Sequence, residues 1–159
     1  MQTGGVFSTV FGIPAHPLFV HAAAVFVPLL ALFAALYALV PRWRAKIGWA
    51  TLTLAIIAPA AALLAKLSGD RFITHRFPQG APANVLQHRS YGTITLWVTL
   101  GLAIATALLL LIHRWPPHED LPAWSRVGSQ LLALAMAAIS VYYVVRTGDS
   151  GSAAVWGRT

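Results

Sequence analysis

The sequence predicts an all-α integral membrane protein, a four-helix up-and-down bundle that forms one membrane domain over residues 1–159. Hydrophobic residues make up 58% of the chain and charged residues only 9%, whereas a soluble domain is about 25% charged. Each of four long stretches meets the requirement of roughly 20 mainly apolar residues that a helix needs to cross a bilayer. These stretches are residues 18–40, 47–67, 91–112 and 127–145, and Lys66 is the only Lys, Arg, Asp or Glu among them.

Proline and glycine predict where the first and last helices begin and end. Pro17 suits the first turn of a helix, which would make His16 the N-cap residue, and Pro41 ends that helix. Asp120 is the expected N-cap of the fourth helix, and Gly148 is its expected C-terminal stop.

The connections differ in length and charge. A short basic turn follows the first span, and a polar stretch with Gly and Pro predicts a loop over residues 68–87. The third helix is expected to start near Pro82 or Asn84, ahead of its apolar part, and a short C-terminal tail covers residues 149–159.

Positive charge gives an expected orientation in the membrane. Residues 1–40 contain no Lys or Arg, whereas the first turn contains Arg42, Arg44 and Lys46. Because positively charged turns tend to remain inside, we expect both termini to lie outside. An even number of spans then brings the termini and the 68–87 loop to one face. Five polar residues are expected to cluster there: His16, Asp70, His75, Arg146 and Asp149.

His21 and His88 are the candidate cofactor-binding residues. His21 lies about 6 Å along the first helix, just inside the apolar region, where an ionisable side chain usually faces the bundle interior. His88 lies near the same face of the third helix. The two imidazoles could share a structural hydrogen bond, ligate haem b or hold another metal. The chain contains no Cys, which excludes thiolate-ligated zinc, iron–sulfur clusters and c-type haem attachment.

Three segments resemble a known bacterial family. They are residues 12–21 (GIPAHPLFVH), His88 with Gly92, and residues 146–157 (RTGDSGSAAVWG). The sequence resembles the membrane family called domain of unknown function 2231 along its whole length. The resemblance implies a small four-helix protein of the bacterial inner membrane with no assigned activity. Some relatives are fused to cytochrome-like domains, which favours a redox function.

Three classes of function fit these observations. The first is a non-catalytic accessory or structural subunit, whose partners would be the lipid bilayer and other membrane subunits or further copies of the chain. The second is a membrane electron-transfer protein that holds b-type haem through His21 and His88. The third is an oligomeric transporter or proton relay, although the spans carry no chain of carboxylates. No catalytic motif is present, so we assign no catalytic residue and do not expect an enzyme. The basic residues end apolar runs, so nucleic acid is not an expected partner.

Overall fold

A computed structural model describes residues 9–10, 13–114 and 121–157. Two antiparallel two-residue strands, β1 and β2, precede the first helix, and a short 3-10 helix, η1, joins α1 to α2. The elements are β1 (Thr9–Val10), β2 (Ile13–Pro14), α1 (Ala15–Leu39), η1 (Pro41–Trp43), α2 (Arg44–Arg76), α3 (Ala83–Arg114) and α4 (Ala123–Trp156). All four α-helices are long and apolar enough to cross a membrane, which confirms the predicted four-helix membrane bundle.

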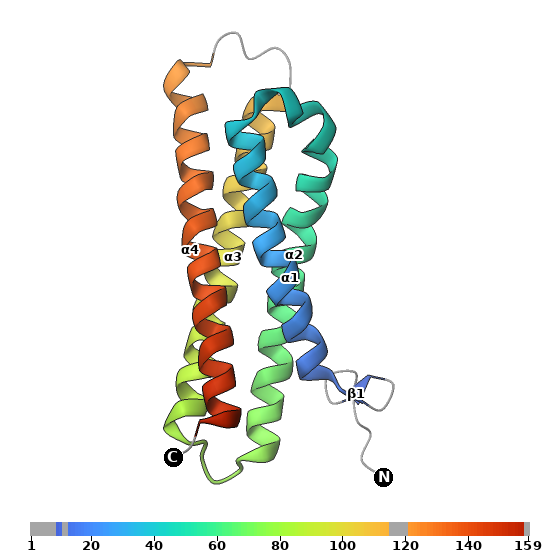
Figure 1. Cartoon of the computed structure of the whole chain (residues 1–159), viewed down its shortest axis with the longest axis vertical. Coiled ribbons are helices and arrows are strands. Elements are labelled where there is room, and N and C mark those ends of the chain that lie inside the picture. Colours follow the sequence, from blue (N-terminus) through green and yellow to red (C-terminus); the bar gives the residue numbers. More distant parts are fainter. Residues whose placement is uncertain (1–8, 11–12, 115–120, 158–159) are drawn as a thin grey trace.

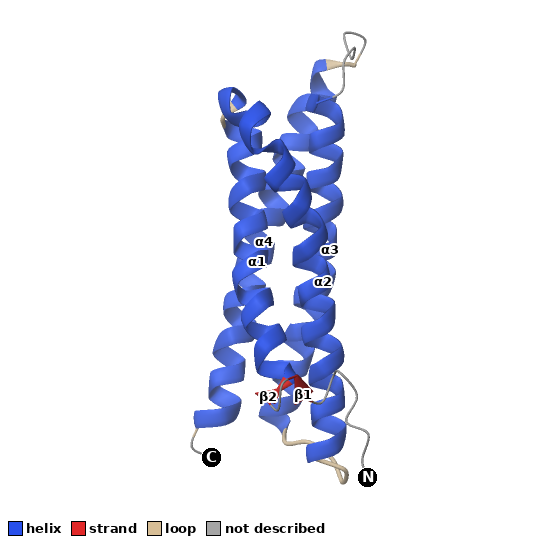
Figure 2. Cartoon of the chain, turned by 90° about the vertical axis from the view of Figure 1, so that its right-hand side faces the viewer, coloured by secondary structure: helices blue, strands red, loops and turns tan. Residues whose placement is uncertain are grey.

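The helices form an up-and-down ring, as Figures 1 and 2 show. Each helix packs mainly against two others, in the pairs α1–α2, α2–α3, α3–α4 and α4–α1. In Figure 1 the start of α1, the turn between α2 and α3, and the end of α4 all lie at the lower end of the bundle. We call this the site end, and the other the far end. The chain enters α1 and α3 from the site end, and α3 begins closer to this end than α1 does, because α2 continues from Ser68, beside His16, to Arg76.

The far half of the bundle is closely packed. Leu30, Ala34 and Leu102 are completely buried in its central core, and Tyr37 and Leu109 continue this core toward the far end. Many of the other core residues are alanines, which allow neighbouring helices to approach closely. At the C-terminal end of α1, the Arg44 side chain donates hydrogen bonds to the carbonyl oxygens of Tyr37 and Ala38. These bonds satisfy acceptors that a helix end otherwise leaves open.

Several expected boundaries are wrong at the site end. Most of the expected 68–87 loop is helical, because α2 continues to Arg76 and α3 begins at Ala83, close to its expected start. Similarly, α4 passes through Gly148 and continues to Trp156. Glycine and serine have low helix propensity, but the packing described below requires them inside these helices. Asp120, the expected N-cap of α4, lies outside the described residues.

Candidate functional site

A cavity of about 720 Å³ lies between all four helices at the site end. Its volume falls within the roughly 300–1,000 Å³ of small-molecule and cofactor pockets. Much of its wall consists of small residues, which leave room that larger side chains would fill. Those on α1, α2 and α3 are Ala23, Ala24, Ala62, Ala65, Gly69 and Gly92.

His16 enters this cavity from the first turn of α1 and is not the expected N-cap, because α1 already begins at Ala15. Its Nδ1 lies 3.1 Å from the Oγ of Ser68 on α2. Ser68 is completely buried, and its hydroxyl donates its only hydrogen to the carbonyl oxygen of Ala65, 3.0 Å away. Ser68 Oγ is therefore the acceptor from His16, and the proton of the neutral imidazole must be on Nδ1.

His88, on α3, is held in the same way by α4. Its Nδ1 lies 3.1 Å from the carbonyl oxygen of Thr147 and 3.2 Å from Ser150 Oγ. Ser150 Oγ in turn donates to the same Thr147 carbonyl, 3.0 Å away. A carbonyl oxygen can only accept, so His88 Nδ1 is also protonated.

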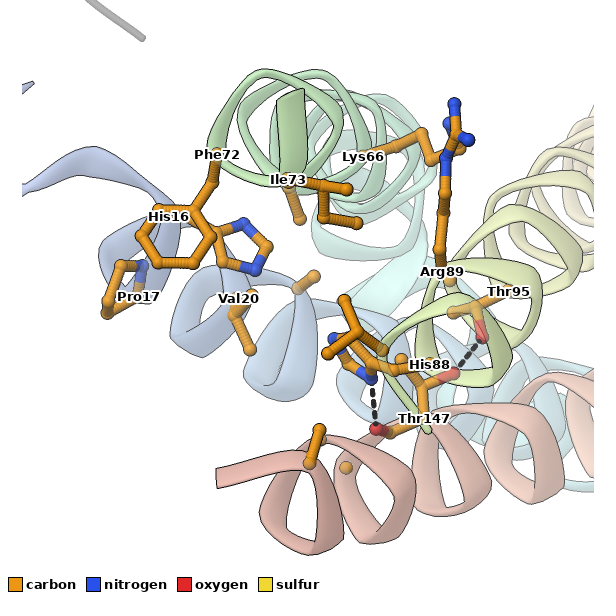
Figure 3. A pocket seen from close by; sticks show the side chains of 18 of the residues that line it. His16, Pro17, Val20, Lys66, Phe72, Ile73, His88, Arg89, Thr95 and Thr147 are labelled. Carbon is orange, nitrogen blue, oxygen red and sulfur yellow. Dashed lines mark hydrogen bonds between the residues drawn. The ribbon is translucent and has the colours of Figure 1, made fainter. Parts of the chain in front are cut away.

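The second ring nitrogen of each imidazole, Nε2, is available to a ligand in the cavity. In Figure 3 the His16 and His88 rings enter the cavity from opposite sides, and Nδ1 of His88 is bonded to Thr147. Within the described part of the chain, neither Nε2 makes a hydrogen bond. In the neutral ring with a proton on Nδ1, Nε2 carries the lone pair that binds a metal. The arrangement therefore presents two metal-ligating nitrogens to one cavity.

Two glycines allow the imidazoles to lie this close to α2 and α4. A Cβ atom built on Gly69 would lie 2.9 Å from Cε1 of His16, and one built on Gly151 would lie 2.9 Å from Cε1 of His88. We define the His16 half-site as His16, Ala65, Ser68 and Gly69, and the His88 half-site as His88, Thr147, Ser150 and Gly151. In each, a histidine on one helix packs against a Ser-Gly pair on the next.

One side of the cavity carries charge. Lys66 and Asp70, one turn apart on α2, form an ion pair, and Arg89 Nε on α3 donates to Asp70 Oδ1 at 2.8 Å. All three residues line the cavity. The Lys66 side chain is only 17% exposed, whereas that of Arg89 is 49% exposed. This trio links α2 to α3 beside His88.

The residues predicted from the sequence are only partly brought together. His21 lines the cavity, but its side chain is exposed and its Nδ1 lies 2.6 Å from the Pro17 carbonyl of its own helix. Of the expected polar cluster, His16 and Asp70 line the cavity. The other three members are exposed outside the cavity lining: His75 and Asp149, together with Arg146, which donates to Tyr91 Oη.

Sequence reasoning missed the residues that hold the two histidines in place. The signal was present, because Ser-Gly occurs at residues 68–69 and again at residues 150–151, each in a helix that follows one of the histidines. Local composition instead predicts a loop at the first pair and the C-terminal tail at the second.

The ligands available here suit one kind of metal centre. Within the described residues, no group of three or more His, Cys, Asp or Glu side chains could hold a metal ion. A bare zinc site needs three or four protein ligands, so two imidazoles are too few. They are sufficient for a metal whose other ligands come from a macrocycle, such as the iron of haem.

Comparison with known proteins identifies a family. The family described as "Predicted membrane protein (DUF2231)" matches residues 12–159. The chain belongs to this family. No curated protein and no solved structure matches it. The match covers both half-sites and all the lining residues of the cavity in this DUF2231 protein.

Proposed function

We propose that this DUF2231 protein binds one b-type haem between His16 and His88 and serves as a membrane electron carrier. The observation that carries this proposal is the pair of Nε2 atoms directed into one cavity from imidazoles whose Nδ1 protons are held by α2 and α4. Hydrogen bonding of the second ring nitrogen is the usual means of orienting a histidine for metal binding.

The volume and the lining of the cavity also support this proposal. The cavity is lined mostly by apolar and small side chains, and its polar groups include the two histidines and the Lys66, Asp70 and Arg89 trio, as in most cofactor pockets. With both His16 and His88 as ligands, the haem would have no position free to bind oxygen or substrate. Such a centre favours electron transfer over chemistry on a bound molecule.

An accessory role in a larger complex, expected from the sequence, is compatible with this proposal, since a small haem subunit would need redox partners. Lipid-facing side chains on α2, such as Trp49 and Ile56, are 67% and 66% exposed and could also contact partner helices. The basic turn at the far end supports an orientation with the site end outside the inner membrane. A cysteine introduced at Ser152 should then react with an impermeant reagent in intact cells.

The test is spectroscopic. The full chain is expressed with a haem precursor and purified in a non-ionic detergent. We expect a Soret band and, after reduction with dithionite, the sharp visible bands of six-coordinate low-spin haem. His16→Ala and His88→Ala should each abolish this low-spin spectrum. His21→Ala is the matched control, because His21 lines the same cavity but bonds its own helix.

Two results would contradict the proposal. A protein that carries no haem after purification and binds no added haemin, while its helical circular dichroism is intact, would overturn the function. A spectrum that depends on His21 and persists in His16→Ala would overturn the assignment of His16 as a ligand.

A further inference from the structure

The three charged residues at the cavity wall, Lys66, Asp70 and Arg89, carry a net positive charge. Asp70 provides the single carboxylate for two cations, Lys66 and Arg89. Lys66 is the more significant of the two cations, because its side chain is only 17% exposed and lies in a helix that spans the membrane. A largely desolvated charge of this kind normally has a full complement of partners. The surplus positive charge faces the cavity and is available to an anion.

The opposite wall is neutral. Lys66 lies two residues before Ser68, and Asp70 two residues after it; the corresponding positions around Ser150 are Gly148 and Ser152. Apart from Thr147, the rest of this α4 wall is apolar and consists of Val144, Gly151, Ala154, Val155 and Trp156. Although the two histidines are held alike, the walls beside them differ. A ligand in the cavity therefore has a cationic wall at α2–α3 and an apolar wall at α4.

We propose that Lys66 and Arg89 bind carboxylate groups on one edge of the ligand, and that the opposite, apolar edge lies against α4. This inference rests on the proposed function. It specifies the ligand as an amphipathic metal macrocycle with its acidic groups on one edge, and it sets the ligand's orientation between the two histidines. Charge-assisted hydrogen bonds from Lys and Arg to carboxylates are among the strongest available to a protein.

The experiment compares two probes that differ only in these carboxylates. The purified chain in a non-ionic detergent, which supplies no phosphate groups, is titrated with haemin and with haemin dimethyl ester. Wild type should bind the ester about tenfold to a hundredfold more weakly, as expected when hydrogen bonds to charged groups are lost. Both probes should give the same bis-imidazole spectrum, because esterification does not touch the iron.

Variants show whether Lys66 and Arg89 are responsible. Lys66→Met and Arg89→Gln should each weaken haemin binding yet leave ester binding nearly unchanged, so that the preference for the free acid falls. Arg146→Gln is the matched control, since Arg146 is an exposed cation near the same end that does not line the cavity. If Lys66→Met does not fold, Lys66→Gln serves in its place. Asp70→Asn should have the opposite effect and raise the preference for haemin over its ester, because it removes the carboxylate that competes with the ligand for Lys66 and Arg89.

The outcomes separate this inference from the function on which it rests. Failure of both probes to bind would overturn the proposed function. If both bind with bis-imidazole spectra and equal affinity, the haem site stands and the orientation is wrong. If Lys66→Met and Arg89→Gln weaken both probes equally, these residues act on the fold and do not recognise carboxylates.

Discussion

The His16 and His88 half-sites hold their imidazoles alike but differ in their surroundings. In both, a serine bonded to a carbonyl three residues earlier accepts the Nδ1 proton, and a glycine lies against the ring. His16 also stacks on Phe72, with ring centroids 6.1 Å apart. His88 instead lies beside a network in which Thr95 Oγ1 and Thr147 Oγ1 are 2.7 Å apart.

The similarity and the difference have separate consequences. Because the two rings are held alike, their Nε2 atoms would be nearly interchangeable as ligands in the proposed complex, and the haem iron would have similar bonds on both sides. Only the α2–α3 side has the Lys66, Asp70 and Arg89 charges. In the proposed complex the half-sites would determine how the iron is ligated, and the wall beside them would determine which way the ligand faces.

Removal of one ligand should have the largest effect. His16→Ala and His88→Ala should each weaken haem binding by more than about a hundredfold, because even loss of a residue behind a metal ligand costs roughly 10-fold to 100-fold. Bound haem should become five-coordinate and high-spin in both variants, as measured by absorbance and electron paramagnetic resonance. Added imidazole should restore the low-spin spectrum. A much larger loss in one variant than in the other would show that the half-sites are unequal.

Filling the glycine positions should have the next largest effect. Gly69→Ala and Gly151→Ala should weaken haem binding by roughly 10-fold to 100-fold. In each variant the new Cβ would displace the imidazole that is proposed to ligate the iron. The losses should be similar, because the two contacts have the same length. Haemin titration measures them. Gly128→Ala is the control: this glycine of α4 has open space around its Cβ position, so binding should not change.

Removal of the serine acceptors should distinguish the half-sites. Ser68→Ala should lower haem affinity by about tenfold, whereas Ser150→Ala should lower it less, because His88 keeps the Thr147 carbonyl at 3.1 Å. Both variants should raise the midpoint potential, because the imidazole becomes a weaker electron donor to the iron. Redox titration measures this shift. Ser129→Ala removes a similar buried serine, bonded to Arg126, and should leave the potential unchanged. Equal effects of Ser68→Ala and Ser150→Ala would mean that the Thr147 carbonyl does not support His88.

The threonine pair should have the smallest effect. Thr95→Val removes the hydroxyl that meets Thr147 Oγ1 and the Tyr143 carbonyl, and should cost about 1 kcal/mol of unfolding free energy. Denaturation in mixed detergent measures this loss. Haem binding should fall by less than about threefold, the equivalent of roughly 0.6 kcal/mol. Thr53→Val, which removes an exposed hydroxyl bonded within its own helix, should leave stability nearly unchanged. A large loss of haem in Thr95→Val would indicate that the network positions His88 directly.

Hydropathy along the chain is sufficient to predict the architecture. Four nearly uncharged stretches leave few alternatives in a bilayer, because a spanning helix must satisfy its own backbone groups. The sequence also identified His88 as a candidate ligand and His16 as a member of the polar cluster. These features could be predicted because hydropathy and residue type are local properties.

The residues that form the half-sites are selected by the packing of the helices. His16 and His21 are five residues apart, so they point about 140° apart around α1, and helix packing alone selects the one that faces Ser68. Ser68-Gly69 and Ser150-Gly151 have the composition of helix ends, yet α2 and α4 continue through both. The low propensity of these pairs is overridden because a ring from another helix needs a missing Cβ and a nearby hydroxyl. That requirement comes from contacts 52 and 62 residues apart in the chain, which no local pattern reports.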